Sequence, residues 1–526
     1  MENTESEVGL STVVYETAEG DRAVVRKIAQ RLKQLAAKYG LTFGSSMIAG
    51  FLAHAFILTN KLINSDDIRF LFGKGSTVSS GRWGLELMSV ISPDFSMPWL
   101  YGLITILLFS IGACMVVSLF NIKSPICQIL WGGVFISFPS LTGTLCYTFT
   151  ATSYAVTFLL AVGGVWLVTR RRIVDDLLAC LLFVLSLGIY QAYLGFICCF
   201  FVILLLQEVM DPEQKTGRIL KDAGHMLIVL VASGIAYLAV TWVILQLTHT
   251  PFNDYAAANM TAETSIPMRI VWAYFDFFRQ MNGLFGIVPS TLLFIMTLIC
   301  ILGAAIALLT GMIKKQPLSR ILMALLLIAL FPLGVDCLYV LLRPDCSHAL
   351  TQYDFVTGYL LVLTLIDRMA LSRPRLQNIL RITTYTALAV IIAGNIFTAN
   401  KTYLNLTLRN EQMEAFYTRI VTQIELQPEF DSDKTVALIG QPALPDDWMS
   451  EFGRTNQIAG VKKTAPGTYS QIEYLNRWIG FNVPFASDEE IEAIKALPEF
   501  EAMPCYPYYG SVAAVGDYII VKFSGD

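Results

Sequence analysis

The chain has 526 residues, of which 55% are hydrophobic and only 15% are charged. Soluble domains carry about 25% charged residues, so this chain cannot hide its apolar residues in one aqueous core and needs lipid as a solvent. The net charge of −4 argues against nucleic acid as a partner. The sequence has no CxxC pair and no Cys/His cluster with zinc spacing, so we predict no structural metal.

The N-terminal segment, residues 1–42, is predicted to lie in the cytoplasm. Residues 1–20 are acidic and polar and should form a flexible tail, while the apolar residues of 21–39 recur at helical spacing among Lys and Arg. This pattern predicts an amphipathic helix on an anionic membrane face, with an ordinary solvated helix as the alternative. About 40 polar residues precede the first apolar run, too many for the start of a signal peptide.

Apolar runs that approach the ~20 residues needed to cross a membrane then follow. They lie near 43–62, 99–120, 127–143, 148–168, 174–189, 193–208, 224–247, 288–312, 320–341, 350–366 and 382–399. The third and the fifth are short, so the stretch between 127 and 189 decides whether the number of spans is odd. With the N-terminus inside, the inner segments hold 20 Lys and Arg and the outer loops 6. This bias follows the positive-inside rule and places the C-terminus outside.

Residues 401–526 are more polar and have strand-like runs at 436–439 and 518–523. A segment of about 125 residues is long enough for a small domain. We therefore predict an all-α polytopic membrane protein of about 11 transmembrane helices, residues 43–400, with a small extracytoplasmic α/β domain at the C-terminus.

Two adjacent carboxylates, Asp66 and Asp67, follow the first predicted span. Carboxylates at this position are costly near lipid unless they are hydrated or paired. They suit a general base that acts on a hydroxyl, or ligands for a divalent cation. The alternative is that they only mark the end of a helix at the membrane interface.

The same outer loop contains Gly73-Lys74-Gly75, which lacks P-loop spacing, and then Gly81-Arg82-Trp83-Gly84. Trp83, Leu87 and Ile91 recur every four residues and predict a short interfacial helix. Arg82 at its start could bind a lipid phosphate through two hydrogen bonds, or could be an interfacial anchor.

Weaker candidates lie in other outer loops. Tyr190 and Gln191 could hydrogen-bond a sugar, and the long loop 248–287 could be a lid. Arg343 and His348 are candidates for binding a phosphate, and Asp336 is expected to face a pore or a partner. Cys337 and Cys346 could form a disulfide or remain two free thiols. The inner loops carry no nucleotide-binding motif, so an outward site would need an energy-rich donor that is already embedded in the membrane.

These motifs together resemble a known family. Asp66-Asp67, then Gly81-Arg82-Trp83, then Tyr190-Gln191, resemble the bacterial Gtr-type glucosyltransferases of the glucosyl transferase II family, which modify O-antigens and other surface polysaccharides. The resemblance covers roughly residues 40–425. The order of the spans and the acidic first outer loop are also similar to the wider GT-C glycosyltransferases.

The resemblance implies a polyprenyl-phosphate sugar as donor, typically undecaprenyl-phosphate glucose, and an inverting transfer to a polysaccharide acceptor on the outer face of a bacterial plasma membrane. It implies that Asp66 or Asp67 takes the acceptor proton. It implies phosphate binding by Arg82, Arg343 and His348, to which we add Arg69. Tyr190, Gln191 and Trp83 would then bind the sugar or the acceptor. Many GT-C enzymes work without a metal, so no cofactor is predicted, although an Asp pair permits a divalent cation.

Other classes stay open. A transporter or flippase of a lipid-linked saccharide would show charges near span centres and two matching halves. A polysaccharide polymerase or ligase would use a large outer loop and a diphosphate-linked donor. A non-catalytic assembly factor is the last alternative.

Overall fold

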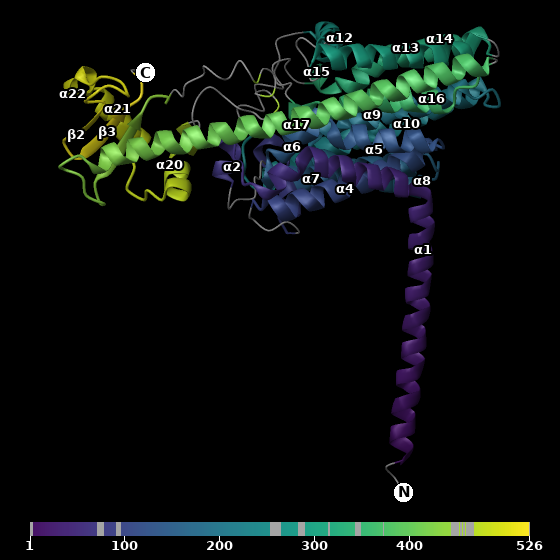
Figure 1. Cartoon of the computed structure of the whole chain (residues 1–526), viewed down its shortest axis with the longest axis horizontal. Helices are drawn as coiled ribbons and strands as arrows, with labels where there is room; N and C mark the ends of the chain where they lie inside the picture. The colour runs from purple at the N-terminus through teal and green to yellow at the C-terminus, as the bar shows by residue number, and fades with distance from the viewer. Residues whose placement is uncertain are drawn as a thin grey trace.

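A computed structural model of the protein describes most of the chain. The described residues are 4–70, 78–90, 96–252, 265–281, 290–313, 316–341, 349–371, 373–442, 452, 455, 458 and 468–524. Long apolar helices lie side by side in one bundle, and a small sheet lies beyond one end of it (Figure 1).

The bundle and its connections contain both α-helices and 3₁₀-helices. The α-helices are α1 (Thr4–Thr59), α2 (Ser65–Arg69), α3 (Gly84–Ser89), α4 (Pro98–Phe120), α5 (Pro125–Ser137), α6 (Pro139–Leu145), α7 (Thr148–Val168), α8 (Ile173–Ile189), α9 (Leu194–Met210), α10 (Thr216–Leu247), α12 (Ile266–Met281), α13 (Thr291–Ile313), α14 (Leu318–Val335), α15 (Cys337–Leu341), α16 (Thr357–Asp367) and α17 (Pro374–Glu425). The 3₁₀-helices are η1 (Val78–Ser80), η2 (Gln191–Tyr193), η4 (Ala349–Thr351) and η5 (Tyr353–Val356).

Within the described part of the chain, eight helices are long and apolar enough to cross a membrane. They are α1 from Arg26, α4, α7, η2 with α9, α10, α13, α14 and α17. The pair α5 and α6, bent by 45°, makes a ninth if it is one span. The bend lies at Pro139, which disfavours helical backbone at the preceding Phe138, whose ψ is 138°. The protein is therefore a polytopic, predominantly helical membrane protein.

Contacts between loops that are far apart in sequence hold one end of the bundle, which we call the basic end. Arg171 pairs with Asp222, Arg368 Nη2 donates to Gln207 Oε1 at 3.0 Å, and the backbone N–H of Ser124 donates to Asp367 Oδ1 at 2.8 Å. These contacts join the loop after α7 to the start of α10, the loop after α16 to the end of α9, and the loop after α4 to the end of α16. The loops predicted to share the inner side therefore lie together.

Two predicted spans are shorter than a full crossing, because α8 has 17 residues and α16 has 11. Helix α8 still runs from the basic end to the opposite end, since Asp176 contacts His225 whereas Tyr190, directly after α8, lines a cavity at the far end. The segment of η4, η5 and α16 together does the same, because Leu350 of η4 lines that cavity and Asp367 ends α16 at the basic end. The bent pair α5–α6 does the same, because it starts next to Ser124 and ends next to Cys146, which contacts α2. The number of 11 crossings stays a prediction.

Helix α1 differs from the prediction for the N-terminus. It begins at Thr4, so residues 4–20 are helical, whereas we expected residues 1–20 to form a flexible tail. No proline precedes Pro93, and nothing in the segment forces a helix to stop. The early part of α1 projects from the bundle (Figure 1), and Ile28, Leu32 and Leu35 are exposed on it. Their contact with a membrane face stays a prediction.

The sheet has three strands, β1 (Thr435–Ile439), β2 (Val512–Val515) and β3 (Tyr518–Lys522), in the order β1-β3-β2. β3 pairs in parallel with β1 (Thr435 with Tyr518) and antiparallel with β2 (Val512 with Val521). One face packs on the end of α17, with α20 (Thr468–Tyr474) and the π-helical turn η6 (Leu475–Ile479) beside it. The other face packs on α21 (Asp488–Lys495) and α22 (Pro498–Ala502).

Helix α17 connects the bundle to the sheet without a break. It has 52 residues and passes through the boundary that we predicted at 400/401. The sequence explains this continuity, because neither Gly nor Pro occurs between Asn395 and Glu425. The two parts of the protein therefore share one continuous helix (Figure 1).

Candidate active site

The acidic pair lies in the first turn of α2, and Asn64 caps this helix. Asn64 Oδ1 accepts hydrogen bonds from the backbone N–H of Asp66 at 3.0 Å and of Asp67 at 2.9 Å. Its amide Nδ2 donates to the carbonyl of Cys146 at 2.7 Å. Asn is among the preferred N-cap residues, and acidic side chains are favourable near a helix N-terminus. Asn64 therefore fixes the start of α2 through its cap and holds α2 against the start of α7 through the contact with Cys146.

The two carboxylates face different surroundings. Asp67 is fully buried and pairs with Lys61, and Ser96 Oγ donates to Asp67 Oδ1 at 3.0 Å. Lys61 Nζ also donates to Ser96 Oγ at 2.8 Å. Burial raises the pKa of the Asp67 carboxyl, and the neighbouring Lys61 ammonium acts in the opposite direction. Asp67 is thus held inside the protein by a cation and a hydroxyl.

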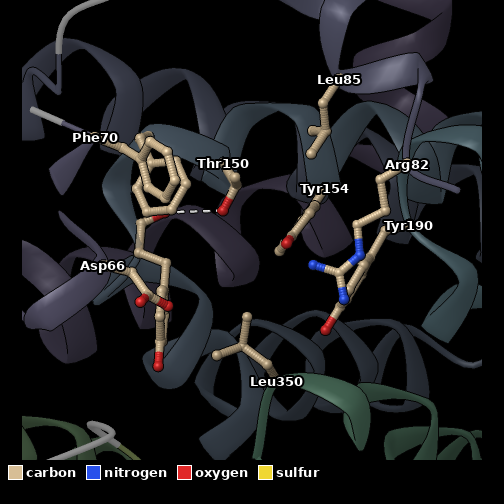
Figure 2. Close-up of a pocket in the computed structure, with 10 residues that line it drawn as sticks. Asp66, Phe70, Arg82, Leu85, Thr150, Tyr154, Tyr190 and Leu350 are labelled. Atoms are coloured by element: carbon tan, nitrogen blue, oxygen red, sulfur yellow. Dashed lines mark hydrogen bonds between the residues drawn. The ribbon is translucent and has the colours of Figure 1, made fainter. Parts of the chain in front are cut away.

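Asp66 instead lines a cavity of about 150 Å³. Figure 2 shows its carboxylate on one side of this cavity and the guanidinium of Arg82 on the other. The other described residues that line the cavity are Phe70, Leu85, Tyr147, Phe149, Thr150, Tyr154, Tyr190 and Leu350. The cavity thus combines one carboxylate, one guanidinium and a mainly aromatic wall.

Two aromatic pairs form much of this wall. The rings of Tyr154 and Tyr190 stack at 4.1 Å with an angle of 9°, and the Arg82 guanidinium carbon lies 4.9 Å from the centre of the Tyr190 ring. Phe70 and Phe149 pack 5.1 Å apart. A cation over an aromatic face is attracted by the ring quadrupole, so Tyr190 helps to orient Arg82.

The segment that carries Arg82 is fixed by α8, α10 and η2. Gly81 has a φ of 75°, a conformation that favours glycine, and its carbonyl accepts from Tyr237 Oη at 3.1 Å. Gln191 Nε2 donates to the Ser80 carbonyl at 3.1 Å and to Tyr237 Oη at 2.8 Å. The Trp83 indole N–H donates to Thr241 Oγ1 at 3.0 Å.

Glycines allow Trp83 and its neighbours to pack closely. A Cβ on Gly188 would lie 2.5 Å from the Trp83 ring, and a Cβ on Gly84 would lie 2.8 Å from the backbone of Gly188. Since real Cβ atoms do not approach this closely, any larger residue at Gly84 must displace the backbone next to Arg82.

The structure brings together only some of the residues that the sequence singled out. Asp66, Arg82 and Tyr190 line the cavity, whereas Trp83 and Gln191 hold the loop behind it. Arg69 is exposed at the end of α2 and is not among the lining residues. Asp336 is buried at the end of α14. Arg343, His348, Cys346 and most of the loop 248–287 outside α12 lie outside the described residues.

The residues of α7 and η4 that line the cavity were not predicted from the sequence. The one signal available was the aromatic run Tyr147-Thr148-Phe149 at the outer end of a predicted span, followed by Tyr154. Aromatic residues are common at membrane interfaces, so this run did not by itself indicate a site.

The described residues give no clear support for a metal centre. No group of three or more His, Cys, Asp or Glu among them is placed to hold an ion. Lys61 already supplies the positive charge next to Asp67. The cavity can offer a carboxylate that accepts a proton and a guanidinium that binds an anion.

The fold and this cavity define a polytopic membrane protein with a carboxylate and a guanidinium on opposite sides of an aromatic pocket. The chain matches the family Glucosyl transferase GtrII over residues 55–365 and belongs to that family. Membership implies glucosyltransferase activity, which requires a sugar donor and an acceptor. No curated protein and no solved structure matches this chain.

Proposed function

We propose that the protein transfers glucose, with inversion, from a polyprenyl-phosphate donor to a cell-surface polysaccharide acceptor at this cavity, on the extracytoplasmic face of a bacterial plasma membrane. The single observation that carries the proposal is that Asp66 and Arg82 lie on opposite sides of one cavity (Figure 2). A displacement at a sugar carbon needs a base on one side and a stabilised leaving group on the other.

In this mechanism Asp66 is the general base. An acceptor hydroxyl oxygen attacks C1 of the donor sugar, and Asp66 takes the hydroxyl proton. Its position in the cavity wall supports this role, whereas the pairing of Asp67 with Lys61 and Ser96 supports a structural role for the second acid.

Arg82 stabilises the leaving group. As the bond between C1 and the phosphate oxygen breaks, its electron pair stays on the polyprenyl phosphate, and negative charge develops there. A guanidinium forms two parallel hydrogen bonds with a phosphate and is already oriented by the Tyr190 ring. Fixed positive charge where negative charge develops lowers the barrier more than charge that must first move into place.

The geometry of α7 supports an outward-facing cavity. Its first turns line the cavity, and Arg170, Arg171 and Arg172 follow its last residue. A helix of 21 residues is about 30 Å long, the thickness of the hydrocarbon core. The cavity and the basic loops are therefore one membrane thickness apart, and the positive-inside rule places the basic end in the cytoplasm.

The test uses the full-length protein in lipid nanodiscs with polyprenyl-phosphate glucose and a surface polysaccharide acceptor. Release of polyprenyl phosphate and labelling of the acceptor are followed together. We expect Asp66→Asn to slow transfer by at least about 100-fold, the contribution of a general base, and Asp67→Asn to slow it much less in protein that remains folded.

Two results contradict the proposal. Full activity of Asp66→Asn would remove the base from the mechanism. With the same protein in sealed proteoliposomes, movement of the labelled donor across the membrane without any release of polyprenyl phosphate would indicate a transporter instead.

A further inference from the structure

The helix that carries Asp66 packs against the C-terminal part of the chain as well as against the bundle. Ile63 and Ile68, 2% and 1% exposed, belong to one apolar cluster with Tyr417 and Ile420 of α17 and Tyr474 of α20. Figure 1 shows α2 and α20 at the same end of the bundle, beside α17. Residues more than 340 positions away in sequence thus surround α2.

One side chain of α17 makes a two-sided contact with the residue that enters α2. Asn410 Oδ1 accepts a hydrogen bond from the backbone N–H of Ile63 at 2.9 Å, and Asn410 Nδ2 donates to the Ile63 carbonyl at 3.0 Å. The same Nδ2 donates to the carbonyl of Leu406, one turn earlier in α17, at 2.8 Å. Asn410 therefore fixes both the position and the orientation of the Ile63 backbone relative to α17.

A second contact holds the other end of α2. Arg477, in η6, donates from Nη1 to the backbone carbonyl of Arg69 at 3.1 Å. The residue after Ile63 is Asn64, whose side chain caps α2 through the N–H groups of Asp66 and Asp67. A displacement of Ile63 would therefore be transmitted through the cap to the Asp66 carboxylate.

We infer that Asn410 is a positioning residue for Asp66. Through this contact, the part of α17 around Asn410 supports the active site without touching the substrate. The inference rests on the proposed function, in which Asp66 is the base. A displacement of about 1 Å in a catalytic group can cost 100-fold in rate, so a contact that touches no substrate can still control the chemical step.

The chain provides a closely matched control, Asn400 of the same helix. Its Nδ2 donates to the carbonyl of Leu52 at 3.0 Å and to the carbonyl of Ile396, one turn earlier, at 2.9 Å. Both side chains thus donate from Nδ2 to a backbone carbonyl of the chain before α2 and to a carbonyl one turn earlier in α17. They differ in that Asn410 also accepts from a backbone N–H and contacts the residue before the α2 cap.

The experiment compares Asn410→Ala with Asn400→Ala in full-length protein in nanodiscs. Transfer kinetics and hydrogen–deuterium exchange of the peptide that contains residues 62–70 are measured on the same samples. We expect Asn410→Ala to lower kcat by about 10- to 100-fold, with donor KM within about threefold, and to speed amide exchange in 62–70. We expect Asn400→Ala to change neither by more than about twofold.

Asn410→Asp provides a second variant, because it keeps the acceptor for the Ile63 N–H but turns a carboxylate oxygen, which cannot donate, towards the carbonyls of Ile63 and Leu406. Its kcat should be at least as low as that of Asn410→Ala. If Asn410→Ala does not fold, Asn410→Ser carries the comparison against Asn400→Ser.

Failure of the inference differs from failure of the proposed function. Equal kcat and equal exchange for the Asn410 and Asn400 variants would overturn the positioning role, while an inactive Asp66→Asn leaves the mechanism intact. A loss of kcat without faster exchange in 62–70 would also overturn it. If Asp66→Asn keeps full activity, the proposed mechanism itself fails, and with it any role for Asn410 in positioning a base.

Discussion

The guanidinium of Arg82 lies over the ring of Tyr190, with its central carbon 4.9 Å from the ring centre, and Tyr190 in turn stacks on Tyr154. The cation is thus held against an aromatic wall before any substrate arrives. The first prediction therefore tests separately what the charge of Arg82 and its orientation by Tyr190 contribute to transfer.

Arg82→Lys keeps the charge and loses the planar fork, so we expect kcat/KM for the lipid donor to fall by about 100-fold, as when one donor to a developing anion is removed. Tyr190→Leu should lower it by about 10-fold, because the cation–π contact contributes about 1 to 2 kcal/mol. Tyr190→Phe keeps the ring and should lose less than Tyr190→Leu. Steady-state kinetics at varied donor concentration measures all three, and equal losses for Phe and Leu would show that the ring does not orient Arg82.

The second prediction concerns the buried pair Lys61–Asp67. Asp67→Asn should lower the free energy of unfolding by about 2 kcal/mol, because it leaves Lys61 without its charged partner. Lys61→Met in the same protein should restore part of this loss, since it removes the unpaired ammonium. Thermal unfolding of the two single variants and the double variant measures the coupling. Additive losses would mean that the two side chains do not stabilise each other.

The third prediction tests the close packing behind Arg82. Gly84→Ala places a methyl group 2.8 Å from the backbone of Gly188, so segment 81–84 must shift. We expect a loss of about 1 to 3 kcal/mol in stability and at least a 10-fold loss of transfer. Gly234→Ala, on α10, has no heavy atom within 4 Å of the added Cβ and is the matched control. Wild-type kinetics in Gly84→Ala would show that the position of Arg82 does not depend on this contact.

The fourth prediction concerns divalent cations. Because Lys61 already pairs with Asp67, the two adjacent carboxylates do not act as a joint cation site in our mechanism. We expect the transfer rate after treatment with EDTA to remain within twofold of the untreated rate. A loss that Mg²⁺ or Mn²⁺ reverses would assign the acidic pair to metal binding.

Most helices could be predicted because the relevant signal is local. Each apolar run identifies a membrane helix by itself, and loop charge then assigns its ends. The bend at Pro139 agrees with a signal from one residue, since a proline disfavours helical backbone in the residue before it, although Pro332 lies inside α14 without such a break. The continuity of α17 was missed because a change in polarity near residue 400 was interpreted as a boundary, although the backbone meets no Gly or Pro there.

The choice between Asp66 and Asp67 could not be made from the sequence. Adjacent residues on a helix point in directions about 100° apart, so one faces the cavity when the other faces the interior. Contacts with Lys61 and Ser96 place Asp67 in the interior and leave Asp66 at the cavity, and Ser96 lies 29 residues away from Asp67. The walls from Tyr147 and Tyr154 depend in the same way on packing between distant segments.

The unbroken course of α17 has a consequence for evolution. A flexible linker tolerates added or lost residues, but each residue inserted into a helix turns everything beyond it by about 100° and moves it by about 1.5 Å. An insertion between Asn400 and Asn410 would rotate Asn410 away from Ile63 and swing the sheet around the helix axis. We therefore expect insertions and deletions in this protein family to be rare between residues 400 and 410. They should occur in the surface loops of the sheet instead.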